Sequence, residues 1–215
     1  MDKIMKNNTD EAREANVAGA ATTTTATATT AVADRHAFGF WVYLMTDLII
    51  FGVLFAVYFI LHPNTFGGPS SNDLFSLSTA LVNTIVLLTS SFTCGLATLA
   101  ARRGKVNQTI TWLAVTFVLG ATFLTLELTE FSRFIAVGAS WQTSAFLSAF
   151  FTLVGTHGLH IAVGLLWIVV AIVQLRLRGL TPAVVSKLDR FTLFWHFLDI
   201  VWIFIFTTVY LMGIM

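Results

Sequence analysis

The sequence has little charge and almost no cysteine. Asp, Glu, Lys and Arg make up 11% of its 215 residues, whereas 56% are hydrophobic, and the mean hydropathy is +0.82. A water-soluble domain of this length needs a far larger polar surface, so the composition predicts an integral membrane protein. Cys94 is the single cysteine and lies in an apolar run, which excludes a disulfide or a thiolate metal site within this chain.

The first 35 residues lack aromatic side chains and long apolar runs. They read MDKIMKNNTDEAREANVAGAATTTTATATTAVADR, which is polar at first and then rich in Thr and Ala. Such a segment cannot bury enough apolar surface to offset the entropy that is lost on ordering. It also lacks the compact apolar core of a cleaved signal peptide. We predict a disordered tail over residues 1–35 and a membrane domain over residues 36–215.

Five long apolar stretches occupy the membrane domain. A helix of about 20 apolar residues crosses the hydrocarbon core of a bilayer. Polar turns rich in Pro, Gly, Asn or Arg separate the stretches. We therefore predict an all-α integral membrane domain of five transmembrane helices, at about residues 38–61, 74–101, 110–131, 141–175 and 191–212.

Basic residues are distributed unevenly between the two sides of these spans. The tail, the loop after the second span and the loop after the fourth span together hold eleven of the twelve Lys and Arg residues. The loop after the first span has none, and Arg133 alone lies near the loop after the third span. Because cytoplasmic loops carry the excess of Lys and Arg, we predict a cytoplasmic N-terminus and a C-terminus outside.

Ionisable side chains inside the spans are the candidate functional residues. A buried ionisable group is costly in a membrane, so it usually faces the bundle interior and has a partner there. At about 1.5 Å of helix rise per residue, five of these groups fall at similar depth in the cytoplasmic half. They are Asp47, His157, His160, His196 and Asp199. On the outer side, Glu130 and Arg133 are three residues apart on one helix, which predicts an ion pair.

The residue types alone leave three roles open for the five inner groups. Histidines on two helices at matching depth can ligate haem, and three or four His and Asp side chains can bind a metal. The same groups can form a hydrogen-bonded polar clamp between helices, or line a proton path. Four arginines at the cytoplasmic ends of the spans are placed to contact anionic lipid headgroups, unless they only set topology. They are Arg102, Arg103, Arg176 and Arg178.

Three stretches of the sequence resemble subunit III of the haem-copper respiratory oxidases, and the resemblance covers residues 36–215. They are FGFWVYLMTDLIIFGVLFAVYFIL, FFTLVGTHGLHIAVGLLW and FWHFLDIVWIFIFTTVYLMG. The five-span layout and the segments SAFFTLVGTHGLH and GLTP are most similar to subunit III of the cytochrome o ubiquinol oxidases. Asp47 stands where many relatives carry a membrane-buried Glu. The positions that match the family motifs are Glu130, His157, His160, His196, Asp199 and Trp202.

This resemblance implies a non-catalytic subunit of a proton-pumping ubiquinol oxidase in a bacterial inner membrane. In that family the haems and the copper lie in subunit I, so the resemblance implies no metal or cofactor in this chain and favours the polar clamp. It also implies bound phospholipid and a complex with subunits I, II and IV, and no nucleic-acid partner. The alternative is a stand-alone b-type cytochrome or an ion-translocating membrane protein that uses the intramembrane histidines.

Overall fold

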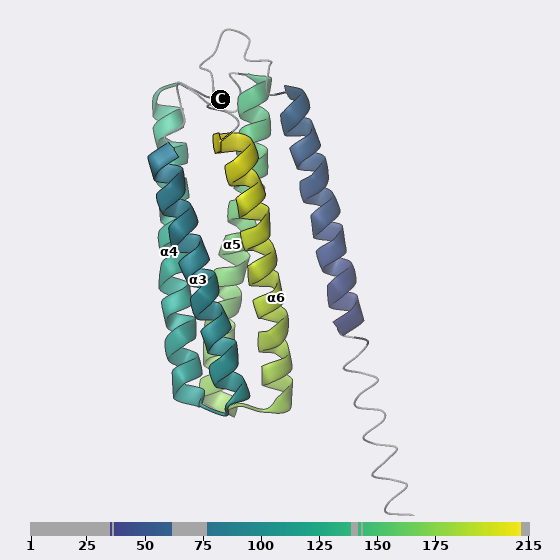
Figure 1. The fold of residues 1–215 in the computed structure, drawn as a ribbon, viewed down its shortest axis with the longest axis vertical. Helices are drawn as coiled ribbons and strands as arrows, with labels where there is room; N and C mark the ends of the chain where they lie inside the picture. The colour runs from purple at the N-terminus through teal and green to yellow at the C-terminus, as the bar shows by residue number, and fades with distance from the viewer. Residues whose placement is uncertain (1–34, 36, 62–76, 139–141, 143, 212–215) are drawn as a thin grey trace, which may run out of the picture. The chain divides into compact units, whose positions relative to one another are not determined.

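The computed structural model describes residues 35, 37–61, 77–138, 142 and 144–211 (Figure 1). Nearly all of these residues are helical, and none of them is in a strand. The predicted tail lies outside the described residues except for Arg35. The chain divides into two units, Met1–Met45 and Thr46–Met215, and every contact described below lies within the second unit.

Five of the described helices are long and apolar enough to cross a membrane, which confirms the prediction of five spans. The last of them passes from α6 directly into a short π-helical segment, η1, so that one span is continuous from Pro182 to Leu211. The helices are Ala37–Leu61, α3 (Leu77–Arg102), α4 (Val106–Ala136), α5 (Ala145–Arg178), α6 (Pro182–Ile205) and η1 (Phe206–Leu211).

The last helix begins earlier than the apolar run predicts, at Pro182 rather than near residue 191. Thr181 caps it, because its hydroxyl accepts a hydrogen bond of 3.4 Å from the backbone N–H of Val184. Proline is favoured at the first helical position, where its missing N–H would be unpaired in any case. The first turns of α6 contain Lys187, Asp189 and Arg190, so they are more polar than the rest of the span, although they are helical.

Two short turns at one end of the bundle are built around glycines. Gly104 separates α3 from α4 with a φ of 73°, and Gly179 ends α5 with a φ of 65°. Glycine adopts these left-handed conformations without a steric penalty, whereas most other residues do not. At the same end of the bundle, the guanidinium of Arg102, the last residue of α3, bonds to a carboxylate oxygen of Asp189 in α6 at 3.2 Å.

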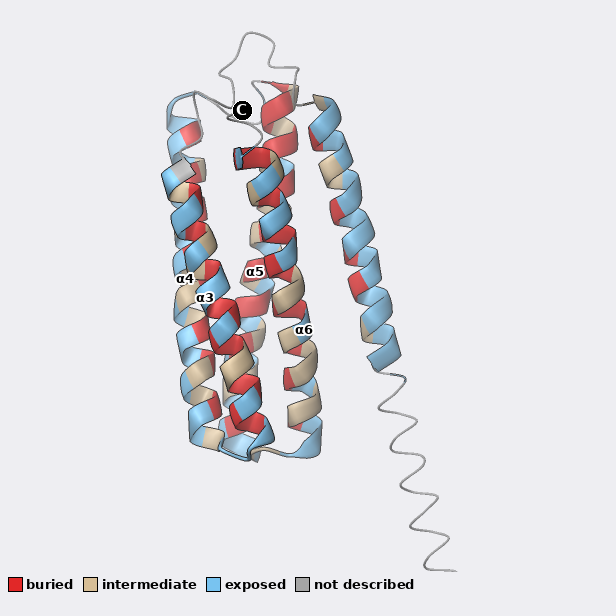
Figure 2. Cartoon of the chain, viewed as in Figure 1, coloured by how far each residue is buried: buried red, intermediate tan, exposed pale blue. Residues whose placement is uncertain are grey.

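The helices α3, α4, α5 and α6 form a bundle in which α3 and α5 each pack against both α4 and α6. Buried positions lie on the faces that these helices turn toward one another, while their outer faces carry exposed apolar residues (Figure 2). Trp195 of α6 fills the centre and is completely buried. Two glycines make room for its ring, because a Cβ at Gly120 or Gly164 would lie 2.9 or 2.8 Å from it.

Candidate functional site

Asp47 and His160 are brought together in the interior. Asp47 lies on the helix Ala37–Leu61 and is 4% exposed, and its Oδ2 is 3.6 Å from Nε2 of His160 on α5. The other ring nitrogen of His160, Nδ1, is 2.7 Å from the carbonyl oxygen of Thr156. Because a carbonyl only accepts, Nδ1 carries a hydrogen, and Nε2 is the nitrogen that faces the carboxyl group. At 3.6 Å the two atoms are within ion-pair distance but too far apart for a hydrogen bond, and Oδ2 of Asp47 has no hydrogen-bond partner among the described residues.

His157, one helical turn before His160, is held by aromatic rings. It is fully buried, and neither of its ring nitrogens has a hydrogen-bond partner among the described residues. Its ring stacks on Trp202 with the centroids 5.4 Å apart, and Phe123 meets it edge-on at 6.0 Å. Aromatic contacts of this kind stabilise a buried ring by about 0.5–1.5 kcal/mol beyond its area. His157 therefore acts here as a packing residue.

The α3–α6 contact brings His196 and Asp199 to a shared partner on α3. The Ser91 hydroxyl forms a short hydrogen bond with Nδ1 of His196, and it lies close enough to Asp199 to act on its carboxyl group. No direct ion pair joins His196 to Asp199 in the described part of the chain. A hydroxyl can donate one hydrogen bond and accept others, so Ser91 can link the imidazole to the carboxyl group.

Further hydrogen bonds join α3 to α6, between residues that neither charge nor hydropathy singles out in the sequence. The indole N–H groups of Trp195 and Trp202 donate to the hydroxyls of Ser90 and Thr84, each at 3.1 Å. The hydroxyls of Thr98 and Thr192 are 2.7 Å apart. One signal was present in the sequence, because Thr84, Ser91 and Thr98 recur at intervals of seven residues and so share one face of a helix.

The C-terminal part of α4 carries two buried carboxyl groups. Glu127 is 3% exposed, and its Oε1 accepts a hydrogen bond of 2.8 Å from the Asn83 side-chain amide on α3. Glu130 is 7% exposed and accepts a hydrogen bond of 3.2 Å from the Tyr210 hydroxyl on η1. Arg133 acts on Glu130 electrostatically. Within the described residues, however, Arg133 makes no ion pair, and the bond that Glu130 forms is the one to Tyr210.

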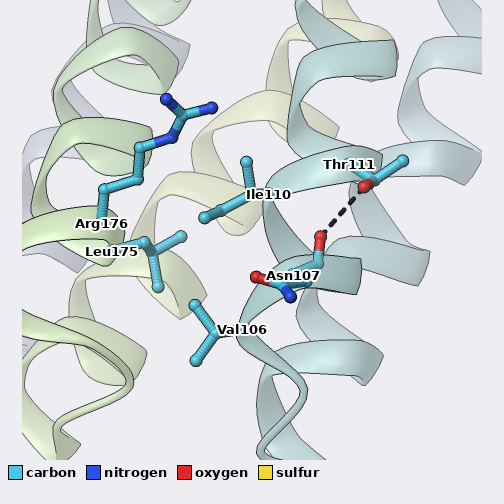
Figure 3. Close-up of a pocket in the computed structure, with 6 residues that line it drawn as sticks. All are labelled: Val106, Asn107, Ile110, Thr111, Leu175 and Arg176. Carbon is cyan, nitrogen blue, oxygen red and sulfur yellow. Dashed lines mark hydrogen bonds between the residues drawn. The ribbon is translucent and has the colours of Figure 1, made fainter.

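The four arginines that were candidates for lipid contacts are all exposed and lie at one end of the bundle. Arg102 is paired with Asp189. Arg176 lines an open pocket between α4 and α5, in which its side chain extends toward the α4 residues Ile110 and Thr111 (Figure 3). Arg103 lies in the turn after α3, and Arg178 is the last residue of α5.

The described residues contain no group of three or more His, Cys, Asp and Glu side chains that could hold a metal ion. Of the inner groups, Asp47 contacts His160, while His196 and Asp199 meet at Ser91. The arrangement is thus a set of separate polar contacts between helices, each made by two or three side chains. Contacts of this kind associate helices in a membrane, where helix packing and interhelical hydrogen bonds replace the hydrophobic effect.

Known proteins share this chain's sequence over most of its length. A family described as cytochrome c oxidase subunit III matches residues 8–214. Subunit 3 of the cytochrome bo(3) ubiquinol oxidase of Pseudomonas aeruginosa is 54% identical over 176 residues, which is 82% of this chain and 84% of the relative. The quinol oxidase subunit 3 of Bacillus spizizenii is 47% identical over 82% of this chain and 86% of the relative. The cytochrome c oxidase subunit 3 of Bacillus sp. (strain PS3) is 45% identical over 81% and 84%.

The fold and the buried polar contacts define a multi-pass helical membrane protein whose spans are joined to one another by side-chain bonds. The comparisons then give its family. The chain belongs to the cytochrome c oxidase subunit III family.

Proposed function

We propose that this chain is the non-catalytic subunit III of a proton-pumping terminal ubiquinol oxidase, a complex that oxidises ubiquinol and reduces oxygen to water in a respiratory chain. The observation that carries the proposal is the 54% identity with subunit 3 of a ubiquinol oxidase over 82% of this chain. Because relatives named for cytochrome c also match, at 45% identity, the electron donor rests on the higher identity to the quinol oxidases.

The chain's part in that complex is structural in this proposal. Subunit I holds the haems and the copper, and this chain packs beside it, with subunits II and IV in the same assembly. The polar clamp supports the proposal, because interhelical contacts such as the Asp47–His160 ion pair and the Ser91–His196 hydrogen bond favour one packing of the spans. In this role the chain stabilises subunit I and holds phospholipid, and it binds no redox cofactor itself.

The proposed location is a bacterial inner membrane, with the N-terminus in the cytoplasm. Eleven of the twelve basic residues lie in segments that this orientation places on the cytoplasmic side, which supports it. Reporter fusions at Gly104, Gly138 and Gly179 test the orientation, with a fourth at Gly67, which lies outside the described residues. The expected order along the chain is Gly67 outside, Gly104 inside, Gly138 outside and Gly179 inside. Any other order contradicts the proposed topology.

Co-purification tests the proposed function directly. An affinity tag on this chain should recover, in mild detergent, a complex that contains a haem-bearing larger subunit and consumes oxygen with ubiquinol. A strain without this chain should still make that larger subunit with its haems, but its oxidase should lose activity during sustained turnover. If instead the chain purified by itself carries a haem with a Soret band, the proposal fails in favour of a stand-alone b-type cytochrome.

A further inference from the structure

Asn83 of α3 and Glu127 of α4 form a buried pair in which two oxygen atoms have no partner. Asn83 is completely buried, and Glu127 is 3% exposed. The Asn83 side-chain amide donates a hydrogen bond of 2.8 Å to Oε1 of Glu127. The other oxygen of each side chain, Oδ1 of Asn83 and Oε2 of Glu127, has no hydrogen-bond partner among the described residues. An unpaired oxygen in the interior is costly, so these two atoms require a further donor.

The surroundings of Glu127 supply no positive charge that pairs with it. The ion pairs within the described residues do not include this carboxyl group. α4 packs against α3, which presents the uncharged Asn83, and against α5, whose His157 ring meets Phe123 one turn before Glu127. Tyr210 of η1 interacts electrostatically with Glu127. An ionised carboxyl group here would therefore be buried with one hydrogen bond and no cation, which is strongly unfavourable.

Glu130, one turn further along α4, has partners that suit a negative charge. The Tyr210 hydroxyl donates to it at 3.2 Å, and Arg133 acts on it electrostatically. Glu127 and Glu130 also act on each other electrostatically. Two carboxyl groups that interact in a low-dielectric interior do not readily ionise together. The difference between their partners favours the charge on Glu130 and a neutral Glu127.

We propose that Glu127 binds a proton on Oε2 and donates it to Oδ1 of Asn83, so that the acid and the amide form a closed pair of hydrogen bonds between α3 and α4. A protonated carboxyl group carries one O–H donor and one carbonyl acceptor, and an amide carries the complementary acceptor and donor. One bond of this pair is the observed bond at 2.8 Å. The proton gives both unpaired oxygens a bond and removes the buried charge. In this role the proton joins two spans.

Infrared absorption of the intact complex tests the proton directly, because the C=O stretching band of a carboxylic acid lies apart from the bands of amides and carboxylates. Wild type and variants are compared by difference, so that carboxylic acids in other subunits cancel. We expect Glu127→Gln to lose the band of one carboxylic acid. The matched control Glu130→Gln changes the neighbouring carboxyl group on the same helix and should keep that band. The proposal is wrong if Glu127→Gln leaves the band unchanged, or if Glu130→Gln removes it instead.

The position of the same band tests whether Asn83 shares the proton. Asn83→Leu removes the donor to Oε1 and the acceptor of the proton, and the C=O stretch of a carboxylic acid moves to higher wavenumber when its hydrogen bonds are lost. In the complex that still contains the subunit, Asn83→Leu should therefore keep the band but shift it upward. A band that stays in place would contradict the pairing with Asn83.

Thermal loss of the subunit from the complex gives an independent measurement. Gln has the shape of a neutral Glu, and its amide can donate to Oδ1 of Asn83 while its carbonyl accepts from Nδ2, so Glu127→Gln should be as stable as the wild type. Glu127→Leu leaves the Asn83 amide unpaired and should shift the equilibrium toward released subunit about tenfold. If Glu127→Gln is lost as easily as Glu127→Leu, the site needs a negative charge, as a bound cation would, and the proposed proton is wrong.

Discussion

The helices α3 and α5 occupy equivalent places in the bundle, since both pack against α4 and α6, but their contacts differ in chemistry. α3 presents hydroxyls and an amide, which bond to Trp195, Trp202 and Glu127. α5 presents rings and a glycine, and its Phe150 lies 6.0 Å from the ring of Phe131 on α4. The contacts of α3 thus include side-chain hydrogen bonds to its neighbours, whereas those of α5 are mainly ring and glycine contacts.

Hydrogen bonds and close contacts constrain different features of helix packing. A hydrogen bond depends on direction, so the bonds of α3 set how its neighbours are rotated and shifted along their axes. Ring and glycine contacts depend on distance and shape, so α5 sets how closely the helices approach. Trp195 takes part in both, because its N–H bonds to Ser90 of α3 while its ring lies against Gly164 of α5.

The largest effect is expected from filling the space at Gly164. A Cβ there would be 2.8 Å from the ring of Trp195, which Ser90 and Gly120 hold from the other sides. Gly164→Ala should therefore lower the free energy of unfolding by about 1–3 kcal/mol through overpacking. Thermal loss of the subunit from the purified complex measures this. The matched control is Gly158→Ala on the same helix, where the Cβ would meet only Leu124 at 3.7 Å and stability should not fall.

The next effect concerns Asn83, whose amide donates the hydrogen bond that Glu127 accepts. Asn83→Leu leaves the buried carboxyl group without that bond, and it should cost about 1–3 kcal/mol in the same assay. The double variant with Glu127→Leu should recover part of the loss, because replacing both partners by apolar groups removes the unpaired group. If the double variant were as unstable as the sum of the two single variants, the bond would not be what holds α3 to α4 here.

Two histidines one turn apart on α5 allow the stability contributed by a polar contact to be compared with that contributed by ring packing. His160→Leu removes the partner of Asp47 and should cost about 1–3 kcal/mol, since a buried carboxyl group is left unpaired. His157→Leu loses the stacking on Trp202 but also removes two unpaired buried nitrogens, so its net effect should be smaller. Equal losses for the two variants would contradict the distinction between these histidines.

The smallest effects are expected from single hydroxyls of α3. Ser91→Ala removes the hydroxyl shared by His196 and Asp199, and Ser90→Ala removes the acceptor of the Trp195 N–H. Side-chain hydrogen bonds between membrane helices contribute about 0.6 kcal/mol on average and at most about 1.7 kcal/mol. We expect losses within this range, with Ser91→Ala the larger because it leaves two ionisable groups without their common partner. A larger loss for Ser90→Ala would reverse that ranking.

The sequence predicts the spans well because hydropathy reports directly on the hydrocarbon core. It does not predict the extra turns of α6 from Pro182, where Lys187, Asp189 and Arg190 end the apolar run but not the helix. Thr181 followed by Pro182 was the available signal for that start. The depth estimate placed Asp47 and His160 in one layer, and the structure places them in contact.

Other parts of the site depend on features that the ionisable residues do not reveal. Ser90 and Ser91 are uncharged and lie in an apolar run, so a search for intramembrane charge passes over them, although they bond to Trp195 and His196. Tyr210 donates its hydrogen bond to Glu130 from a π-helical segment. A π-helix has more residues per turn than an α-helix, so its side chains point in different directions from those that α-helical spacing predicts. Such a segment cannot be recognised from hydropathy or from spacing in a single sequence.

The central claim is that the histidines within the spans hold helices together and ligate no redox centre. The most direct measurement is the haem and copper content of the purified oxidase, determined alongside the amount of this subunit, in variants at His157, His160 and His196. His196→Leu should loosen the subunit from the complex, and adding Asp199→Asn should restore part of it, because no unpaired buried carboxylate then remains. Haem content, copper content and the absorption spectrum should stay at wild-type values in every variant. A variant that keeps the subunit in the complex but loses a haem or the copper would contradict the account.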